Sequence, residues 1–200
     1  MQLHKRDVVA KAAAILDSYG IADLTMRRLA RELDVTPGAL YWHFANKQEL
    51  LGAVADRVLA PACAEPEATG WRLRIETICR ALRDALLSHT DGAELVSASF
   101  AAGQSEAMTR ILALLAGAAV DAGMDDGRAT LAARSILYYV LGFTADEQSR
   151  LQWDAAGADV PQASPGDNPS ARFAFGLHLL INGIGAEVNV GAGNLEKTSH

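Results

Sequence analysis

Closely spaced helix start and stop residues divide the first 60 positions of the chain into four short helical segments. In the first segment, apolar side chains recur every three or four positions, which is the spacing of one face of an α-helix. Gly20 follows, and glycine readily takes the left-handed conformation that ends a helix. We therefore predict an amphipathic helix ahead of Gly20. Its apolar positions are Val8, Ala12, Ile15, Leu16 and Tyr19.

The second and third segments begin at residues that cap helices. Thr25 is the expected N-cap of a helix over residues 26–33. After a two-residue turn, Thr36 is the expected cap of a third helix that begins at Pro37. Proline suits the first helical position, because the N–H it lacks would have no partner within the helix. We expect this third helix to run to about Phe44.

A fourth helix is predicted over residues 47–59. Asn46 is a favourable N-cap, and Glu49 lies where a capping box needs a carboxylate. Residues 60–70 contain two prolines and a glycine, so we interpret them as a linker.

Helical patterns continue after the linker, and no strand pattern of any weight is present. The expected helices cover residues 71–88, 93–103, 105–123, 126–150 and 170–190, with a long loop at 154–169. The fold class is therefore all-α. We expect an N-terminal domain at 1–60, which holds the three-helix head and a connecting fourth helix, and a second domain at 61–200.

Charge is distributed unevenly along the chain. The net charge of −6 by itself disfavours binding to nucleic acid. Residues 1–60, however, hold eight Lys/Arg against seven Asp/Glu, and residues 61–200 hold ten against seventeen. This division is compatible with DNA contact confined to the N-terminal part. The positive side chains near the expected reading surface are Arg27, Arg28, Arg31 and Lys47.

Cysteine usage and hydropathy exclude several classes of protein. Cys63 and Cys79 match no metal-ligand spacing, and we expect two free thiols, no metal site and no cofactor. No secretory signal is recognisable, and the longest apolar run, residues 111–120, is too short to cross a bilayer. We therefore expect a cytoplasmic protein with no membrane partner.

The second and third helices, with the turn between them, form a predicted helix-turn-helix that the first helix braces. Its outward residues, 36–43, would enter the major groove of DNA. The side chains at the start of the third helix are small, so that Ala39 can approach a thymine methyl group. The residues expected to pack the two helices together are Leu29, Leu33, Val35 and Leu40.

Larger side chains with polar tips follow in the third helix. Tyr41, Trp42 and His43 are consecutive, so they cannot all face a core. Tyr41 and His43 can hydrogen-bond to phosphates, and Lys47 can neutralise one. Arg27 lies in the first turn of the second helix, where it can reach a guanine or the DNA backbone.

Three strings in this region resemble the DNA-binding domain of the tetracycline-repressor family. They are LTMRRLA at 24–30, LYWHF at 40–44 and NK at 46–47. Shorter stretches at 85–89, 91–93, 146–148 and 173–177 are similar to the regulatory core of that family. The resemblance implies ten helices, in which the head and connecting helix lead to an α-helical regulatory core that dimerises through its last long helices.

The resemblance also implies a set of DNA contacts. Positions 37–39 differ from those of the tetracycline repressors, so we expect a different operator sequence. The family's contact positions fall on Arg27, Pro37, Gly38, Ala39, Tyr41, Trp42, His43 and Lys47. With the capping residues Thr25 and Thr36, these form the predicted DNA-binding set.

The ligand site departs further from the tetracycline repressors. Their magnesium-binding histidine falls on Val96 of this chain, and their drug-binding asparagine falls on Ile78. Neither side chain can coordinate a metal or donate a hydrogen bond, so we expect an inducer other than magnesium–tetracycline. The pocket that remains is mostly apolar, as small-molecule sites usually are. The predicted ligand-binding residues are Leu82, Leu86, Val96, Ser99, Phe100, Leu112, Leu115 and Asp146.

The sequence thus predicts a homodimeric repressor that binds a palindromic DNA operator and is released by a small, largely apolar effector. The alternative is an effector-independent DNA-binding regulator whose core only dimerises. Ser88, His89 and Asp91 raise the possibility of a hydrolytic trio. A nucleophile, a base and an acid must converge in space, and these residues are nearly adjacent in the chain. We therefore expect no enzymatic activity.

Overall fold

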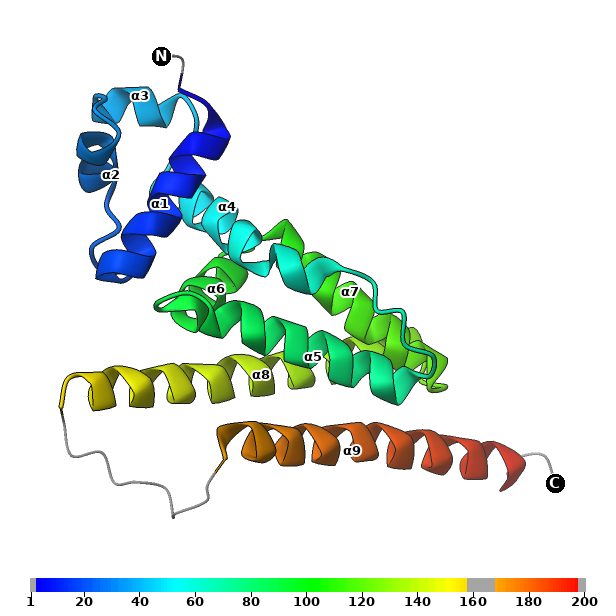
Figure 1. The fold of residues 1–200 in the computed structure, drawn as a ribbon. Coiled ribbons are helices and arrows are strands. Elements are labelled where there is room, and N and C mark those ends of the chain that lie inside the picture. Colours follow the sequence, from blue (N-terminus) through cyan, green and yellow to red (C-terminus); the bar gives the residue numbers. More distant parts are fainter. Residues whose placement is uncertain (1–2, 158–167, 198–200) are drawn as a thin grey trace. The chain divides into compact units, whose positions relative to one another are not determined.

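The computed structural model describes residues 3–157 and 168–197, with side chains described up to residue 189. These residues are helical, without strands, and the predicted all-α class is confirmed (Figure 1). The resemblance implied ten helices, and the described residues form nine α-helices and one short 3-10 helix. They are α1 (Lys5–Tyr19), α2 (Met26–Glu32), α3 (Pro37–Tyr41), α4 (Lys47–Leu59), the 3-10 helix η1 (Ala60–Cys63), α5 (Trp71–Leu87), α6 (Gly92–Ala101), α7 (Glu106–Asp121), α8 (Asp126–Ala155) and α9 (Pro169–Lys197).

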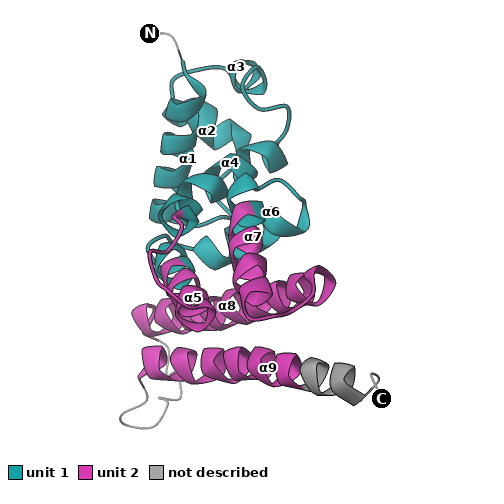
Figure 2. Cartoon of the chain, turned by 90° about the vertical axis from the view of Figure 1, so that its right-hand side faces the viewer, with its two compact units in different colours: residues 1–63, 82–109 teal, residues 64–81, 110–200 magenta. Residues whose placement is uncertain are grey.

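The chain packs into two compact units (Figure 2). Unit 1 contains residues 1–63 and 82–109, and unit 2 contains residues 64–81 and 110–200. Helix α5 contributes its first part to unit 2 and its last part to unit 1. The predicted division at residue 60 separates a DNA-binding domain from a ligand-binding and dimerisation domain. This functional division stays a prediction.

Unit 1 holds the helix-turn-helix. Within it, α1 packs on α4, α2 packs on α3, and α4 packs on α6. Leu29 and Leu40 are fully buried, as expected for the contact between α2 and α3, whereas Leu33 and Val35 are half-buried. Phe44 is fully buried as well.

The capping residues define most of the predicted helix starts in unit 1. The Thr25 hydroxyl accepts a hydrogen bond from the Arg28 N–H (3.1 Å), and the Asn46 side chain accepts one from the Glu49 N–H (2.8 Å). Glu49 in turn accepts from the backbone N–H of Ala45 (2.8 Å). The expected capping box therefore closes one residue before the N-cap, which still satisfies two backbone donors at the start of α4.

Unit 2 contains two long helices, α8 and α9, which lie side by side and antiparallel (Figure 1). An aromatic cluster joins them, in which the ring centroids of Tyr139, Phe143 and Phe173 are 5.4–5.8 Å apart. The Tyr139 hydroxyl donates to the carbonyl of Phe173 (2.8 Å). Gly176 allows this contact, because a Cβ there would overlap the Tyr139 ring.

The largest differences between predicted and observed helix ends are in α3, α8 and α9. Helix α3 ends at Tyr41 rather than near Phe44, because the N–H groups of residues 43 and 44 both donate to the carbonyl of Leu40 and the chain leaves the helix. Helix α8 continues to Ala155, and α9 spans Pro169–Lys197. The predicted loop at 154–169 is therefore shortened at both ends, and its residues 158–167 lie outside the described residues.

The two cysteines do not form a disulfide with each other, as expected. Cys63 is partly buried and Cys79 is buried. Burial, and to a smaller extent the neighbouring Glu76 carboxylate, raises the pKa of the Cys79 thiol.

Among the described helices, none is both long and apolar enough to cross a membrane.

Candidate nucleic-acid interface

A left-handed turn sets the direction of α3. Asp34 has a φ of 54°, and the N–H of Val35 donates to the carbonyl of Ala30 (3.0 Å). Aspartate is one of the few non-glycine residues that visit this conformation readily. Thr36 is then extended at the N-cap position, and Pro37 takes the first helical position, as predicted. The expected capping hydrogen bond from the Thr36 side chain is not formed. The third helix therefore leaves α2 through a turn with fixed backbone geometry.

The two faces of α3 differ in exposure. Leu40 is fully buried within unit 1, and Ala39 is half-buried. Thr36, Pro37 and Gly38 are exposed. The predicted base-reading tip thus consists of small or compact side chains that face solvent, and such a surface can approach base edges closely.

Large aromatic side chains are exposed directly after this tip. Tyr41 is 52% exposed and Trp42 is 90% exposed, whereas His43 is half-buried. Tyrosine and tryptophan carry a polar tip on a large apolar ring, a combination suited to binding interfaces. The sequence-based expectation that these three residues cannot all face a core is confirmed.

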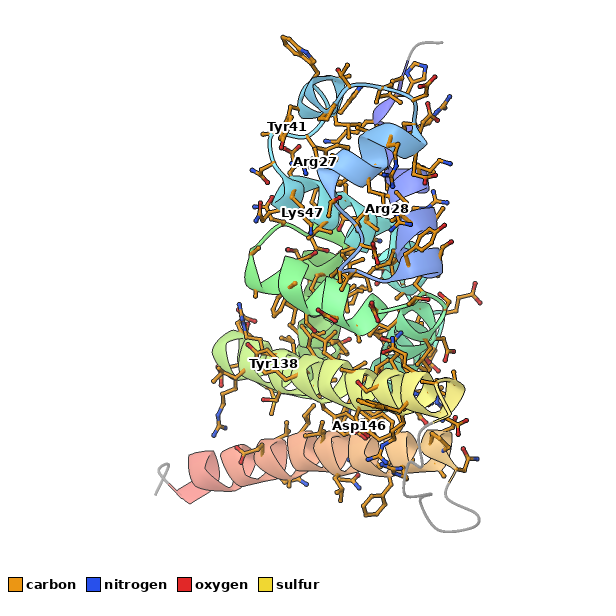
Figure 3. All side chains as sticks on the ribbon, turned by 90° about the vertical axis from the view of Figure 1, so that its left-hand side faces the viewer. Arg27, Arg28, Tyr41, Lys47, Tyr138 and Asp146 are labelled. Carbon is orange, nitrogen blue, oxygen red and sulfur yellow. The ribbon has the colours of Figure 1, made fainter. Side chains whose placement is uncertain are left out.

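Three further cations lie on α2 and α4, the helices before and after α3 in the chain. Arg27 and Arg31 are exposed on α2, and Lys47 is half-buried at the start of α4. None of the three forms an ion pair with another described residue. In Figure 3, Arg27, Tyr41 and Lys47 are labelled on the part of unit 1 formed by α2, α3 and the start of α4. Their positive charge is therefore available to DNA phosphates.

Two other cations of unit 1 are already engaged. The Arg28 guanidinium lies 3.7 Å from the centroid of the Tyr19 ring and 2.5 Å from a carboxylate oxygen of Asp23. Lys5 lies over the Phe44 ring (4.7 Å) and pairs with Glu49 (3.3 Å). The sequence placed Arg28 among the charges near the reading surface, and its pairing with Asp23 was not predicted.

Glu49 connects three segments of the head. Its side chain accepts from the Ala45 N–H, which follows α3, and pairs with Lys5 at the start of α1. The Ala45 hydrogen bond, and then the Lys5 hydrogen bond, hold the pKa of this carboxyl below its ordinary value of 4.5. Glu49 therefore fixes the start of α4, and with it the position of Lys47.

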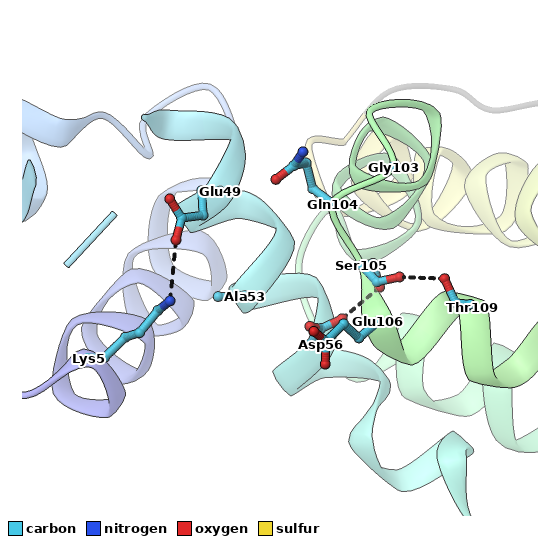
Figure 4. Close-up of a pocket in the computed structure, with 9 residues that line it drawn as sticks. All are labelled: Lys5, Glu49, Ala53, Asp56, Gly103, Gln104, Ser105, Glu106 and Thr109. Carbon is cyan, nitrogen blue, oxygen red and sulfur yellow. Dashed lines mark hydrogen bonds and ion pairs between the residues drawn. The ribbon is translucent and has the colours of Figure 1, made fainter. Parts of the chain in front are cut away.

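A polar cleft of about 350 Å³ lies beside this contact, still within unit 1 (Figure 4). Asp56 of α4 accepts hydrogen bonds from the Ser105 hydroxyl (2.7 Å) and the Ala107 N–H (3.0 Å), which caps α7. Gly52 of α4 permits close approach, because a Cβ there would overlap the backbone of Gln104. Gly52 and Asp56 were not among the residues predicted from the sequence, although a glycine inside a predicted helix is a recognisable sign of close packing.

The α5–α6 turn is bound to the end of α1. The Asp17 carboxylate contacts Nδ1 of His89 (2.9 Å) and accepts from the Thr90 N–H (3.3 Å), and Asp91 accepts from the Ile21 N–H (2.9 Å). The hydroxyl of Ser88, the third member of the sequence trio, donates to the backbone carbonyl of Ala85 (2.7 Å). Each member of that trio thus contacts a different group.

The predicted ligand-binding residues are divided between the two units. In unit 1, three apolar residues are fully buried, and Ser99 is buried with a hydroxyl that has no hydrogen-bond partner among the described atoms. In unit 2, Asp146 is exposed and pairs with Arg150 (2.8 Å). The members in unit 1 are Leu82, Leu86, Val96, Ser99 and Phe100, and those in unit 2 are Leu112, Leu115 and Asp146.

Two family models match the chain. The model described as "Bacterial regulatory proteins, tetR family" matches residues 8–54, and the one described as "Tetracyclin repressor-like, C-terminal domain" matches residues 63–165. The tetracycline repressor protein class E of Escherichia coli is 32% identical over 199 residues, which cover 92% of this chain and 91% of that protein.

Solved structures agree with the family models. A crystal structure of Mycobacterium smegmatis BioQ is 64% identical, with a TM-score of 0.87, and covers 92% of this chain and 99% of its own. BioQ crystallised with its natural double-stranded DNA operator is 62% identical, with a TM-score of 0.82 and the same coverage. A TetR variant from Acinetobacter baumannii AYE in complex with minocycline is 34% identical, with a TM-score of 0.73, and covers 91% of this chain and 96% of its own.

The matched models cover most of the chain, and the first of them spans the helix-turn-helix described above. The curated relatives that match over 91% of their own length are tetracycline repressors, which are regulators of transcription rather than enzymes. The chain belongs to the tetR family of bacterial regulatory proteins and is a DNA-binding transcriptional regulator.

Proposed function

We propose that the protein is a repressor that binds a palindromic duplex operator as a homodimer and is released by a small ligand. The observation that carries this proposal is the exposure of Tyr41 and Trp42 beside cations of α2 and α4 that have no ion-pair partner among the described residues. Phosphate contacts would set affinity and register, and the tip of α3 would read bases. The operator complex of BioQ supports duplex DNA as the partner.

Dimerisation is supported by the outer surfaces of α8 and α9. An apolar groove of about 560 Å³ there is lined by residues that include Tyr139, Phe143 and Phe175. Phe175 is 68% exposed and Leu179 is 59% exposed. Tyr138, which Figure 3 labels on α8, is exposed as well. A second copy of these helices would bury this apolar surface, and two-fold symmetry would match a palindromic site.

The proposed effector is largely apolar and carries one hydrogen-bonding group. Buried leucine and valine side chains dominate the predicted ligand residues of unit 1, and the Ser99 hydroxyl lacks a partner there. A buried hydroxyl without a partner costs free energy that a ligand group can recover. Val96 and Ile78 can neither coordinate a metal nor donate a hydrogen bond, so we expect an inducer other than magnesium–tetracycline. Because the family is one of bacterial regulatory proteins and the proposed partner is operator DNA, we expect the protein to act in the cytoplasm.

Operator binding can be tested with duplexes selected from random-sequence DNA by the purified protein. We expect selected sites to be palindromes whose half-sites lie about 34–36 Å apart, or a multiple of that distance. Footprinting and gel shifts at modest salt then measure specific binding. A selection that yields no preferred duplex would exclude the proposed function.

The effector can be sought by thermal shift with a set of small apolar compounds. A compound that raises the unfolding temperature and weakens binding to the selected duplex by about 5–150-fold supports release by ligand. If stabilising compounds leave DNA affinity unchanged, or if none stabilises the protein, the effector-independent regulator is the better description.

A further inference from the structure

The two adjacent arginines of α2 have different surroundings. Arg27 is exposed and forms no ion pair with a described residue. The Arg28 side chain is only 19% exposed, and its guanidinium stacks on the Tyr19 ring at 3.7 Å. One of its terminal nitrogens lies 2.5 Å from Asp23, and its backbone N–H donates to Thr25.

These contacts link three consecutive parts of the head. Tyr19 is the last residue of α1, Asp23 lies in the turn that follows, and Thr25 is the N-cap of α2. The Nε of Arg28 is buried without a partner in the described structure, so the guanidinium is held by the stacked ring and the single carboxylate. Stacking on an aromatic face is a property of the planar guanidinium that lysine does not reproduce.

The direction of α2 matters for DNA reading, because α2 carries α3. The two helices pack on each other, and the turn at Asp34 fixes α3 relative to α2. A change in the angle between α1 and α2 would therefore displace the exposed tip of α3 within a major groove. Bidentate and methyl contacts to bases require close geometry, whereas phosphate contacts by long flexible side chains tolerate small displacements.

We infer that Arg28 is a positioning residue for operator reading, which acts through Tyr19 and Asp23 and does not contact DNA. It sets the orientation of the helix-turn-helix relative to α1. The inference rests on the proposed operator binding and adds a residue outside the predicted DNA-binding set.

The test uses the full-length protein and a duplex selected by the wild-type chain. A non-specific duplex of the same length is the second probe. Affinities are measured by fluorescence anisotropy over a range of salt, well below the unfolding temperature, and are corrected for the fraction of folded protein. The variants are Arg28→Lys, Arg28→Ala, Tyr19→Ala and Tyr19→Phe, with Arg57→Ala as a control for loss of an exposed charge on α4.

We expect Arg28→Lys and Tyr19→Ala each to weaken binding to the selected duplex by roughly 3- to 30-fold. Binding to the non-specific duplex and the salt dependence should stay unchanged. Tyr19→Phe should bind like wild type, because the ring is retained. The double variant Arg28→Lys/Tyr19→Ala should bind no more weakly than the poorer single variant, because both changes remove one contact.

Two results would overturn the inference. If Arg28→Lys binds like wild type and Arg28→Ala weakens both duplexes with a smaller salt dependence, Arg28 is a phosphate contact. If the variants lower the unfolding temperature while the folded protein keeps wild-type affinity, Arg28 is only structural. A selection in which the wild-type chain prefers no duplex would instead refute the proposed function, so the two failures are distinguishable.

Discussion

At the scale of single residues, Lys47 offers a direct test of electrostatic DNA binding. It is the first residue of α4 and forms no ion pair among the described residues. We expect Lys47→Ala to weaken binding to all duplexes alike and to reduce the slope of log K against log salt by about 0.9, the effect of one lost phosphate contact. Lys47→Arg should retain the slope. Titrations at several salt concentrations check this, and an unchanged slope in Lys47→Ala would rule out the phosphate contact.

Ala39 is expected to influence sequence preference rather than overall affinity. It lies on α3 between the exposed Gly38 and the buried Leu40, and it is half-buried itself. A serine there replaces the methyl group with a hydroxymethyl group, whose hydroxyl can hydrogen-bond to a base edge. We expect Ala39→Ser to select a different base at one position of each half-site, with the salt slope unchanged. Repeating the duplex selection with the variant measures this, and recovery of the wild-type site would contradict it.

Glu49 is expected to make the stability of the head depend on pH. Its pKa is lowered in the folded protein by the Ala45 N–H and by Lys5, so the carboxylate stabilises the fold above the ordinary pKa of 4.5. This contribution is lost as the pH falls through the lowered value. We expect Glu49→Gln to be less stable than wild type at neutral pH, and the difference to shrink in acid. Urea unfolding at a series of pH values measures it, and a difference that is constant with pH would contradict it.

At the scale of helices, local sequence determined starts better than ends. Thr25 and Asn46 satisfy backbone donors within three residues of themselves, so the starts of α2 and α4 could be predicted from the chain alone. The end of α3 could not be predicted in this way. Phe44 continues the apolar pattern and is fully buried, yet its N–H donates to Leu40 from a turn. A buried side chain can therefore continue the periodic pattern of apolar residues even where the backbone is no longer helical.

The features of the candidate interface also divide into those that local sequence predicts and those that depend on distant segments. That Tyr41, Trp42 and His43 do not all face the core followed from their being consecutive, a local property of the sequence. The pairing of Arg28 with Tyr19, and of Asp17 with the α5–α6 turn, depends on how distant segments approach one another. Nothing in the residue types alone distinguishes Arg28 from Arg27, because the difference lies in what faces each side chain.

The approach of α4 to the segment before α7 leads to a prediction about Gly52. A Cβ at this position would overlap the carbonyl oxygen of Gln104, which belongs to the backbone and cannot rotate away. We expect Gly52→Ala to destabilise the protein by about 1–3 kcal/mol despite the better helix propensity of alanine. Gly117→Ala is the matched control, since a Cβ there meets nothing within 4 Å, and we expect a gain of up to about 1 kcal/mol. Urea unfolding of both variants decides, and equal effects would refute the packing argument.

At the scale of the whole molecule, the net charge of −6 limits the ways in which the protein can bind DNA. An acidic chain gains little from long-range attraction to DNA, so its binding must rely on cations placed at the reading surface. Few such cations remain, because Lys5 and Arg28 are engaged within the head. One head with so few phosphate contacts would bind weakly. Two linked heads on one duplex would bind far more tightly, because the second contact is intramolecular.

Disruption of the proposed dimer should therefore remove most operator affinity without touching the head. Phe175 is exposed on α9 and lines the apolar groove, so Phe175→Glu would place a charge in the proposed interface. We expect a monomer in sedimentation velocity, a large loss of affinity for a palindromic duplex, and little change for a duplex with one half-site. Leu73→Glu is the matched control, because Leu73 is exposed on α5 in the same unit but does not line the groove. If Phe175→Glu stays dimeric while Leu73→Glu does not, the interface lies on α5 rather than on α8 and α9.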